Sequence, residues 1–238
     1  MARDDPARRL TAALDEHQRL HDPALEPRNR LPRLPGLRRW QAARLARSFR
    51  PLLDDATTRP AAEFFLSDLY GDHDFSRRDA DVARVAPMMQ RLLPRPLVAT
   101  VADAVELAAL SHRLDLAVAA ELQQLLPGDA AIDEASYAEA YRAAGTRPLR
   151  ARQIDLIARA GAGLAQAMRM PGIGTLLRLS RAPARAAGVE ALQGFLERGH
   201  AAFARLRDAD GFVRRIETAE REVSRRLFAG AADPFGAP

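Results

Sequence analysis

Carboxylate and imidazole side chains on separate segments of the chain could form a metal centre between helices. Helical di-iron proteins bind their metals through Glu side chains and Glu-x-x-His motifs that project into a bundle. Here Glu106 and His112 are six residues apart, a rotation of about 240° around a helix, so the two do not both point straight into one site. We therefore predict no cofactor, with iron or another divalent metal as the alternative. The candidate metal ligands are Glu63, Glu106, His112 and His200.

Two more histidines have the spacing of metal ligands. His17 and His21 are four residues apart, so both lie on one helix face, as in a two-histidine clamp. Such pairs also arise by chance on a polar helix face, which is the interpretation we prefer. His112 falls on the apolar stripe of the longest predicted helix, where a core histidine with satisfied hydrogen bonds is the commoner outcome.

Glycines and arginines in a basic segment near residue 172 form a second candidate site. Gly172 and Gly174 precede a predicted helix, and the free N–H groups at a helix start can bind a phosphate or carboxylate. Arginines beside them would add charged hydrogen bonds. The pattern lacks the strand and the third glycine of a dinucleotide fingerprint, so a tight turn between helices is the alternative. The candidate anion-binding residues are Arg169, Gly172, Gly174, Thr175, Arg178 and Arg181.

Composition and motifs exclude several other functions. The chain has no cysteine, which rules out disulfides and thiolate metal sites and fits a reducing compartment. It contains no Gly-x-Ser-x-Gly, Walker loop or His-Glu-x-x-His motif, and no catalytic residue is predicted. The N-terminal residues lack the apolar run of a secretory signal. No uncharged apolar stretch is long enough to span a membrane, so we expect a cytoplasmic protein.

Charge is distributed unevenly along the chain, although its formal net value is only +5. Residues 1–50 contain 12 arginines and 6 acidic residues, a net of +6. Residues 51–146 contain 8 arginines and 16 acidic residues, a net of −8, and residues 147–185 contain 8 arginines and 1 acidic residue, a net of +7. This pattern predicts either that the segments pack together or that a basic face binds an anionic partner. The acidic middle interrupts any continuous basic track and argues against nucleic acid as that partner.

The elements that must position these residues are all predicted to be helices. No segment alternates strictly between apolar and polar residues, as a half-buried strand would. We predict an all-α, bundle-like single domain of about eight to ten helices. The longest helix, over residues 97–126, is apolar around much of its girth and is expected at the centre. The predicted divisions are an N-terminal helix and proline-rich arm (1–36), the helical domain (37–230) and a flexible tail (231–238).

Residues 60–94 predict two helices that meet at a tight corner rich in aromatic side chains. Pro60 suits the first turn of the first helix and Gly71 its left-handed end. Ser76 can cap the second helix, with Asp79 three residues later as the acid of a capping box. We interpret this corner as part of the core and not as a reactive site. Its residues are Phe64, Phe65, Tyr70, Gly71, Ser76 and Asp79.

The corner motif also resembles a known family. The pattern FFLxxLYG, followed by DFSxRD, is similar to that of an uncharacterised all-helical family of proteobacterial proteins. The likeness covers roughly residues 40–230 and includes Phe195 to Gly199. It implies a helical fold and supplies no catalytic residue, because that family has no established activity.

These observations favour a non-enzymatic cytoplasmic helical domain that acts through protein–protein contact or self-association. Its partner would be another protein or a second copy of the chain. The alternative is a helical-bundle metal-dependent oxidase, or a protein that binds a small anionic ligand in a pocket between helices.

Overall fold

Every regular element in the described part of the chain is a helix, which confirms the predicted all-α single domain. The computed structural model describes residues 5–69, 81–87, 90 and 94–236. Residues 81–87 are helical, η1 is a 3₁₀-helix and η2 is a π-helix. The named elements are α1 (Pro6–His21), η1 (Pro27–Arg30), α2 (Arg33–Ser48), α3 (Arg50–Asp54), α4 (Arg59–Phe64), η2 (Phe65–Leu69), α6 (Arg95–Leu125), α7 (Glu134–Ala143), α8 (Arg147–Met168), α9 (Ile173–Leu179), α10 (Arg181–Ala186), α11 (Glu190–Phe203) and α12 (Ala209–Ala229).

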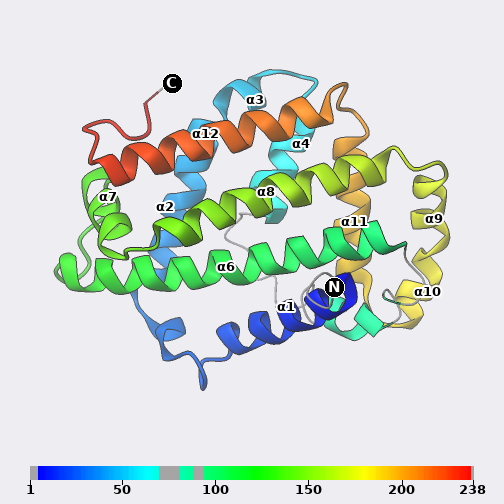
Figure 1. The fold of residues 1–238 in the computed structure, drawn as a ribbon, viewed down its shortest axis with the longest axis horizontal. Coiled ribbons are helices and arrows are strands. Elements are labelled where there is room, and N and C mark those ends of the chain that lie inside the picture. Colours follow the sequence, from blue (N-terminus) through cyan, green and yellow to red (C-terminus); the bar gives the residue numbers. More distant parts are fainter. Residues whose placement is uncertain (1–4, 70–80, 88–89, 91–93, 237–238) are drawn as a thin grey trace.

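The long helix α6 lies at the centre of the molecule, as predicted. α12, α8, α6 and α1 lie side by side, and α2, α4 and α11 cross them (Figure 1). α6 buries Val98, Leu114 and Leu116 among its neighbours. Within the described residues, no helix is both long enough and apolar enough to cross a membrane.

The C-terminal end of α6 is built around a buried arginine. Arg33 of α2 is 8% exposed and donates hydrogen bonds to four backbone carbonyls in the turn between α6 and α7. Its Nη2 lies 3.1 Å from the oxygen of Leu126 and 3.2 Å from that of Pro127, and it also donates to Gly128. The last carbonyls of a helix lack partners within the helix and carry its negative dipole end. Arg33 therefore caps α6 and ties α2 to it.

Two helices contain a proline in their first turn. α2 begins at Arg33, within the residues 1–36 predicted as an N-terminal helix and proline-rich arm, so Pro35 is its third residue. Pro183 is likewise the third residue of α10. A residue in the first turn has no partner for its N–H within the helix, so a proline there loses no hydrogen bond.

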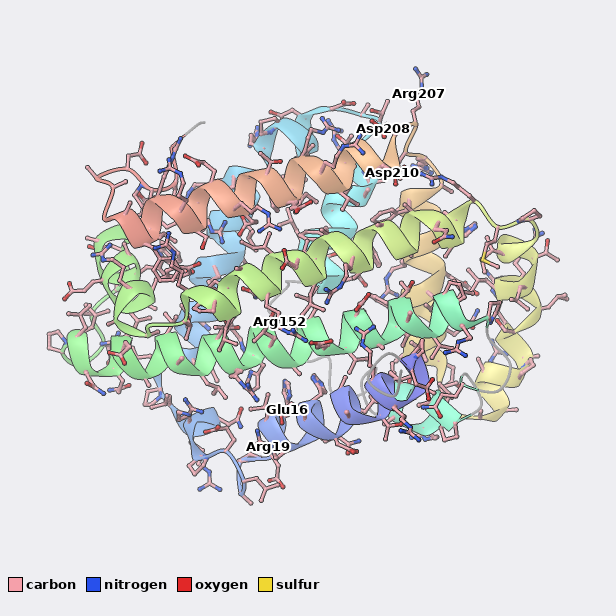
Figure 2. The ribbon with its side chains drawn as sticks, viewed as in Figure 1. Glu16, Arg19, Arg152, Arg207, Asp208 and Asp210 are labelled. Carbon is pink, nitrogen blue, oxygen red and sulfur yellow. The ribbon has the colours of Figure 1, made fainter. Side chains whose placement is uncertain are left out.

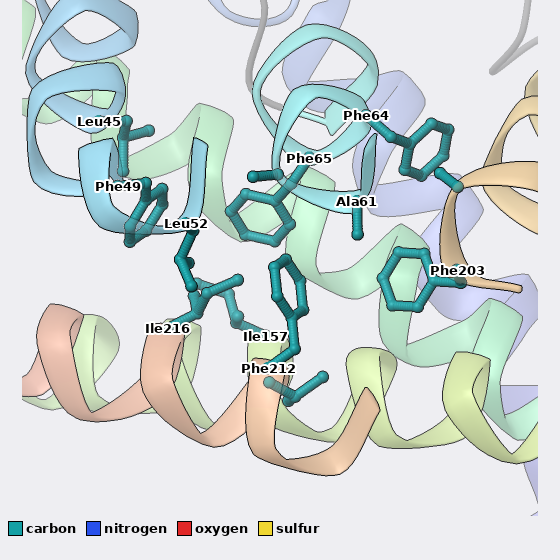
Figure 3. Packing of buried hydrophobic residues seen from close by; sticks show 13 residues of the cluster. Leu45, Phe49, Leu52, Ala61, Phe64, Phe65, Ile157, Phe203, Phe212 and Ile216 are labelled. Carbon is teal, nitrogen blue, oxygen red and sulfur yellow. The ribbon is translucent and has the colours of Figure 1, made fainter. Parts of the chain in front are cut away.

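The phenylalanines of the predicted corner belong to a larger aromatic core. Phe64 and Phe65 are buried with Phe49, which lies between α2 and α3, and with Phe203 of α11 and Phe212 of α12 (Figure 3). Pro60 lies in the first turn of α4, as predicted. The other predicted corner residues lie outside the described residues: Tyr70, Gly71, Ser76 and Asp79.

A second core lies where α2, α6 and α7 meet. Trp40 stacks on Tyr137 with ring centroids 4.2 Å apart, and Phe235 approaches Trp40 edge-on at 5.6 Å. Arg226 donates to the carbonyl of Gly236 at 2.8 Å. Residues near the C-terminus thus contact the same core as α2 and α7.

Glycines let α8 approach both of its long neighbours. A Cβ atom on Gly161 would lie 2.7 Å from Cγ2 of Val213 on α12, and one on Gly163 would lie 2.2 Å from Oγ1 of Thr100 on α6. Real Cβ atoms do not approach other heavy atoms so closely, so the helix spacing at these points requires glycine.

We expect Gly161→Ala to lower the free energy of unfolding by about 1–3 kcal/mol, because buried Val213 has no room to move aside. Gly36→Ala in α2 is the matched control, since a Cβ there would be 3.8 Å from Ile132, an ordinary contact. It should raise stability by about 0.5–1 kcal/mol through helix propensity alone. Urea titrations of both variants measure this. Equal stabilisation by both would show that α8 and α12 are not in close contact.

Candidate functional site

The middle of α6 carries a group of polar and charged residues that face neighbouring helices. Each of them forms a hydrogen bond or ion pair with α1, η1, α2 or α8. Polar and charged groups on a central helix are candidates for catalysis or ligand binding. We call this group the α6 polar belt: Asp103, Glu106, Ser111, His112, Arg113 and Asp115.

At one end of the belt, two carboxylates bind arginines from both sides. Arg9 of α1 donates to Asp103 and, at 3.3 Å, to Glu106. Arg152 extends from α8 towards α6 and its Nε donates to Glu106 at 3.0 Å (Figure 2). Burial raises the pKa of Glu106, but the hydrogen bonds and charges of Arg152 and Arg9 outweigh burial and hold that pKa below its ordinary value. Glu106 therefore stays ionised and acts as a bridge between α1 and α8.

His112, at the centre of the belt, is 4% exposed and uses both ring nitrogens. Nη2 of Arg38 lies 2.9 Å from Nδ1, and Oδ1 of Asn29 lies 2.8 Å from Nε2. A guanidinium group only donates hydrogen bonds, so Nδ1 must accept and Nε2–H must donate to Asn29. The amide nitrogen of Asn29 donates in turn to the carbonyls of Leu20 and Glu26. His112 is thus neutral and fixed in one tautomer.

Two histidines of α1 extend this centre. The ring of His21 stacks on His112 at 3.9 Å, and the ring of His17 lies 4.1 Å from that of His21. Burial, followed by the charges of His21 and Arg38, lowers the pKa of His112 to about 3. A protonated imidazole here would face an arginine across a hydrogen bond that only the neutral ring can accept.

The other end of the belt connects α6 with α2 and α8. Nε2 of Gln41 donates to Asp115 at 3.1 Å, and Nε2 of Gln153 donates to the hydroxyl of Ser111 at 2.8 Å. Burial raises the pKa of Asp115, against the charge of Arg150 and the hydrogen bond from Gln41. Arg150 donates to Gln153 at 3.0 Å and lies over the ring of Tyr141 at 4.6 Å.

The belt fixes the position of each neighbouring helix along α6. Gln41 of α2 and Gln153 of α8 each bind one α6 residue, and Arg9 of α1 binds the pair Asp103 and Glu106. A buried polar group without its partner costs about 1–3 kcal/mol, so sliding a helix by one turn is costly. The reactive groups of the belt are therefore used in internal bonds.

The four candidate metal ligands have different surroundings in the structure. Glu63 is exposed on α4, Glu106 binds Arg9 and Arg152, and His112 binds Arg38 and Asn29. His200 of α11 lies against Gly174 of α9, where a Cβ would be 3.1 Å from its ring. Among the described residues, no group of three or more His, Cys, Asp or Glu side chains could hold a metal ion. The metal centre stays a prediction from the sequence.

The candidate anion-binding residues lie around α9, with two of the three arginines bound to carboxylates. Arg169 donates to Asp210 at 2.5 Å, and Nε of Arg181 donates to Glu197 at 2.6 Å. Arg178 donates to Thr175 at 3.2 Å. Gly172 precedes α9 with a φ of 80°, and Gly174 lies inside the helix. The predicted tight turn is present, and anion binding stays a prediction.

A shallow groove beside α2 and α3 offers little to a ligand. Its volume is about 320 Å³ and its walls are Ala46, Arg47, Arg50 and Leu53. Arg50 binds Asp54 and Arg47 binds Glu134, so both cations have partners.

α9 differs from the other helices of comparable or greater length because none of its residues is buried. Leu176 is 53% exposed and Leu179 is 72% exposed, and these two residues are three apart, on one helix face. Met170, in the preceding turn, is 36% exposed. Arg178 and Arg185 are exposed nearby. We call this surface the basic apolar face: Met170, Leu176, Arg178, Leu179 and Arg185.

Family membership rests on one match. A family model described as Domain of unknown function (DUF8198) matches residues 20–234. The chain belongs to that family. No curated protein and no solved structure matches the chain. The match confirms the predicted membership of a family without an assigned activity, whereas the FFLxxLYG motif as its signature and the proteobacterial range stay predictions.

The DUF8198 region contains the whole α6 polar belt but not all of its partners. Asn29, Arg38 and Gln153 lie within residues 20–234, whereas Arg9 and Glu16 of α1 precede them. Sequence reasoning missed the partners Asn29 and Arg38. The sequence feature that could have indicated them is the set of polar residues on the apolar stripe of α6. Each buried polar residue there needs a hydrogen-bond partner from another helix.

His112 should make the stability of this DUF8198 chain depend on pH. Its pKa is about 3 when folded and 6.5 in the reference state, so between these values only the unfolded chain is protonated there. Neutral His112 therefore stabilises the folded chain fully above pH 6.5. This stabilisation is lost as the pH falls below 6.5, by roughly 1.4 kcal/mol per pH unit. His112→Gln keeps an acceptor and a donor but does not titrate.

Urea titrations of the wild type and of His112→Gln between neutral and acid pH measure the difference. The wild type should lose stability more steeply as the pH falls. All other titrating groups are common to both proteins and cancel in the comparison. Parallel curves would mean that His112 is not held neutral in the folded chain.

Proposed function

We propose that this chain is a non-enzymatic cytoplasmic domain that acts by binding another protein surface through its basic apolar face. The observation that carries this proposal is the exposure of Leu176 and Leu179 together on a helix that has no fully buried residue. Single exposed leucines are ordinary, but neighbouring ones bordered by charge are typical of interaction sites.

The apolar exposure is concentrated at one end of the molecule. Of the six large apolar side chains exposed in the described part of the chain, four lie between residues 170 and 196: Met170, Leu176, Leu179 and Leu196. Burying one leucine in an interface is worth about 1.5–3 kcal/mol. A partner that covered this cluster would therefore gain a substantial part of its binding free energy from it.

Polar contacts connect α9 and the segment that follows it, residues 180–189, to neighbouring elements. Nε2 of Gln193 on α11 donates to the carbonyl of Leu177 at 2.6 Å. Arg181 binds Glu197 through two hydrogen bonds of 2.6 and 2.8 Å. Nη1 of Arg84 donates to the carbonyl of Gly188 at 2.9 Å. Leu176 and Leu179 remain exposed beside these contacts, as a docking surface requires.

The charge around α9 indicates an acidic partner. Residues 169–189 contain four arginines and no acidic residue. Arg169 and Arg181 bind Asp210 and Glu197, but within the described residues Arg178 and Arg185 form no ion pair with a carboxylate. Complementary charge at the rim of an interface speeds association and selects the partner.

Internal use of the α6 polar belt also supports a binding role over catalysis. His112 and Glu106 already bind Arg38, Asn29, Arg9 and Arg152. A general acid or base needs a substrate proton within hydrogen-bond reach of its reactive atom. Both ring nitrogens of His112 are hydrogen-bonded to protein side chains, so neither is available to a substrate.

Site-specific photo-crosslinking in the native host tests the proposal. A benzoylphenylalanine at position 179 should give a covalent adduct with a protein, and this adduct should weaken when Arg178 is changed to Glu. Leu25, which is 62% exposed in the turn after α1, is the matched control position. Adducts at position 179 that are no stronger than those at position 25, or that ignore Arg178→Glu, would refute a binding face on α9.

A further inference from the structure

We infer that the basic apolar face binds the acidic end of a second copy of this chain, so that copies join head to tail. The inference rests on the proposed function, because it names the partner of the same face. The acidic end is the tip formed by the C-terminal part of α6, the following turn and α7. It comprises Glu121, Leu125, Asp129, Asp133, Glu134 and Glu139.

The charge of the acidic end mirrors that of the α9 region. Residues 121–139 contain five acidic residues and no arginine, against four arginines and no acidic residue in residues 169–189. Asp129 and Glu139 are exposed, and within the described chain neither forms an ion pair. The charge of Arg33 lies under this tip, where four carbonyls bind it. Two exposed cations border these acids: Arg47 reaches Glu134 at 3.4 Å, and Arg142 follows Glu139 by three residues on α7.

Each end also offers apolar surface next to its charge. Leu125 is 37% exposed and lies four residues after Glu121, on the same face of α6. Asp129 follows in the turn. On the other end, Leu176 and Leu179 border Arg178. An interface with leucines at its centre and opposite charges around them has the composition of stable protein contacts.

The two ends cannot meet within one molecule. α8 has 22 residues and runs from the acidic end to α9, a length of about 33 Å at 1.5 Å per residue. α7 and α9 lie at opposite ends of the molecule (Figure 1). The attraction between them is therefore satisfied only between copies.

A contact between two different surfaces of identical chains has a defined consequence. It leaves one free face at each end of every pair, so association continues until a ring closes or an open chain forms. A symmetric dimer through α9 would bring arginines of two copies together and would be opposed by their repulsion.

Two double variants test the head-to-tail contact. Leu179→Ser with Arg178→Glu disrupts the basic apolar face, and Leu125→Ser with Asp129→Arg disrupts the acidic end. All four side chains are exposed, so both variants should keep the wild-type melting temperature, checked by circular dichroism. Leu25→Ser is the control for loss of an exposed leucine elsewhere.

Sedimentation velocity at increasing protein concentration provides the measurement. The wild type and Leu25→Ser should form species larger than a dimer. Each double variant alone should associate roughly tenfold or more weakly, as expected for the loss of a buried leucine. A mixture of the two double variants should form a one-to-one dimer that does not grow, because one intact face of each kind remains.

Other outcomes overturn the inference. These are a wild type that is monomeric at every concentration, an acidic-end variant that associates as well as the wild type, or a mixture that stays monomeric. Added salt must weaken the wild-type assembly, because the charges are exposed and screened.

The crosslinking experiment separates this inference from the proposed function. An adduct at position 179 with a different protein, together with a monomeric wild type, keeps the binding face and excludes a second copy as its occupant. An adduct between two copies supports both.

Discussion

The fold depends on covering α6 on nearly all sides. A helix of 31 residues with this much apolar surface must be surrounded, and α1, α2, α7 and α8 do so. Apolar contacts alone tolerate sliding of one helix along another. The α6 polar belt prevents this sliding, because its groups reach their partners only when each covering helix is at one position along the axis of α6. Hydrophobic burial provides the driving force, and the belt provides the alignment.

Arginine is the side chain that makes most of these connections, and it has the geometry for the task. Its planar guanidinium group donates in several directions at once, which an ammonium group on a flexible stem does less well. Arg33 binds four carbonyls, and Arg44 binds Glu220 of α12 through hydrogen bonds of 2.5 and 3.2 Å while 7% exposed. Much of the positive charge of the chain is therefore structural, whereas exposed Arg178 of α9 forms no ion pair with a carboxylate of the described residues.

The sequence was sufficient for the helical fold because the periodic apolar stripe and the caps are local signals. The 97–126 prediction for α6 differs from the observed Arg95–Leu125 by two residues at most. It was not sufficient for the start of α2, because the effect of Pro35 depends on its position within the first turn. His112 was correctly placed on the apolar stripe, but its partners Asn29 and Arg38 are 83 and 74 residues away. Contacts over such separations depend on how the helices pack, which periodicity does not specify. The exposure of Leu176 and Leu179 was hidden for the same reason, because a helix with apolar residues is ordinarily expected to bury them.

The stacked indole of Trp40 gives the molecule a built-in optical reporter. It is the only tryptophan of the chain and lies between Tyr137 and Phe235, in the core that supports the tip of α6 and α7. Its emission therefore follows the surroundings of that tip and of the C-terminal residues, and it is insensitive to changes confined to α9 at the far end. A single intrinsic fluorophore thus distinguishes events at one pole of the protein from events at the other.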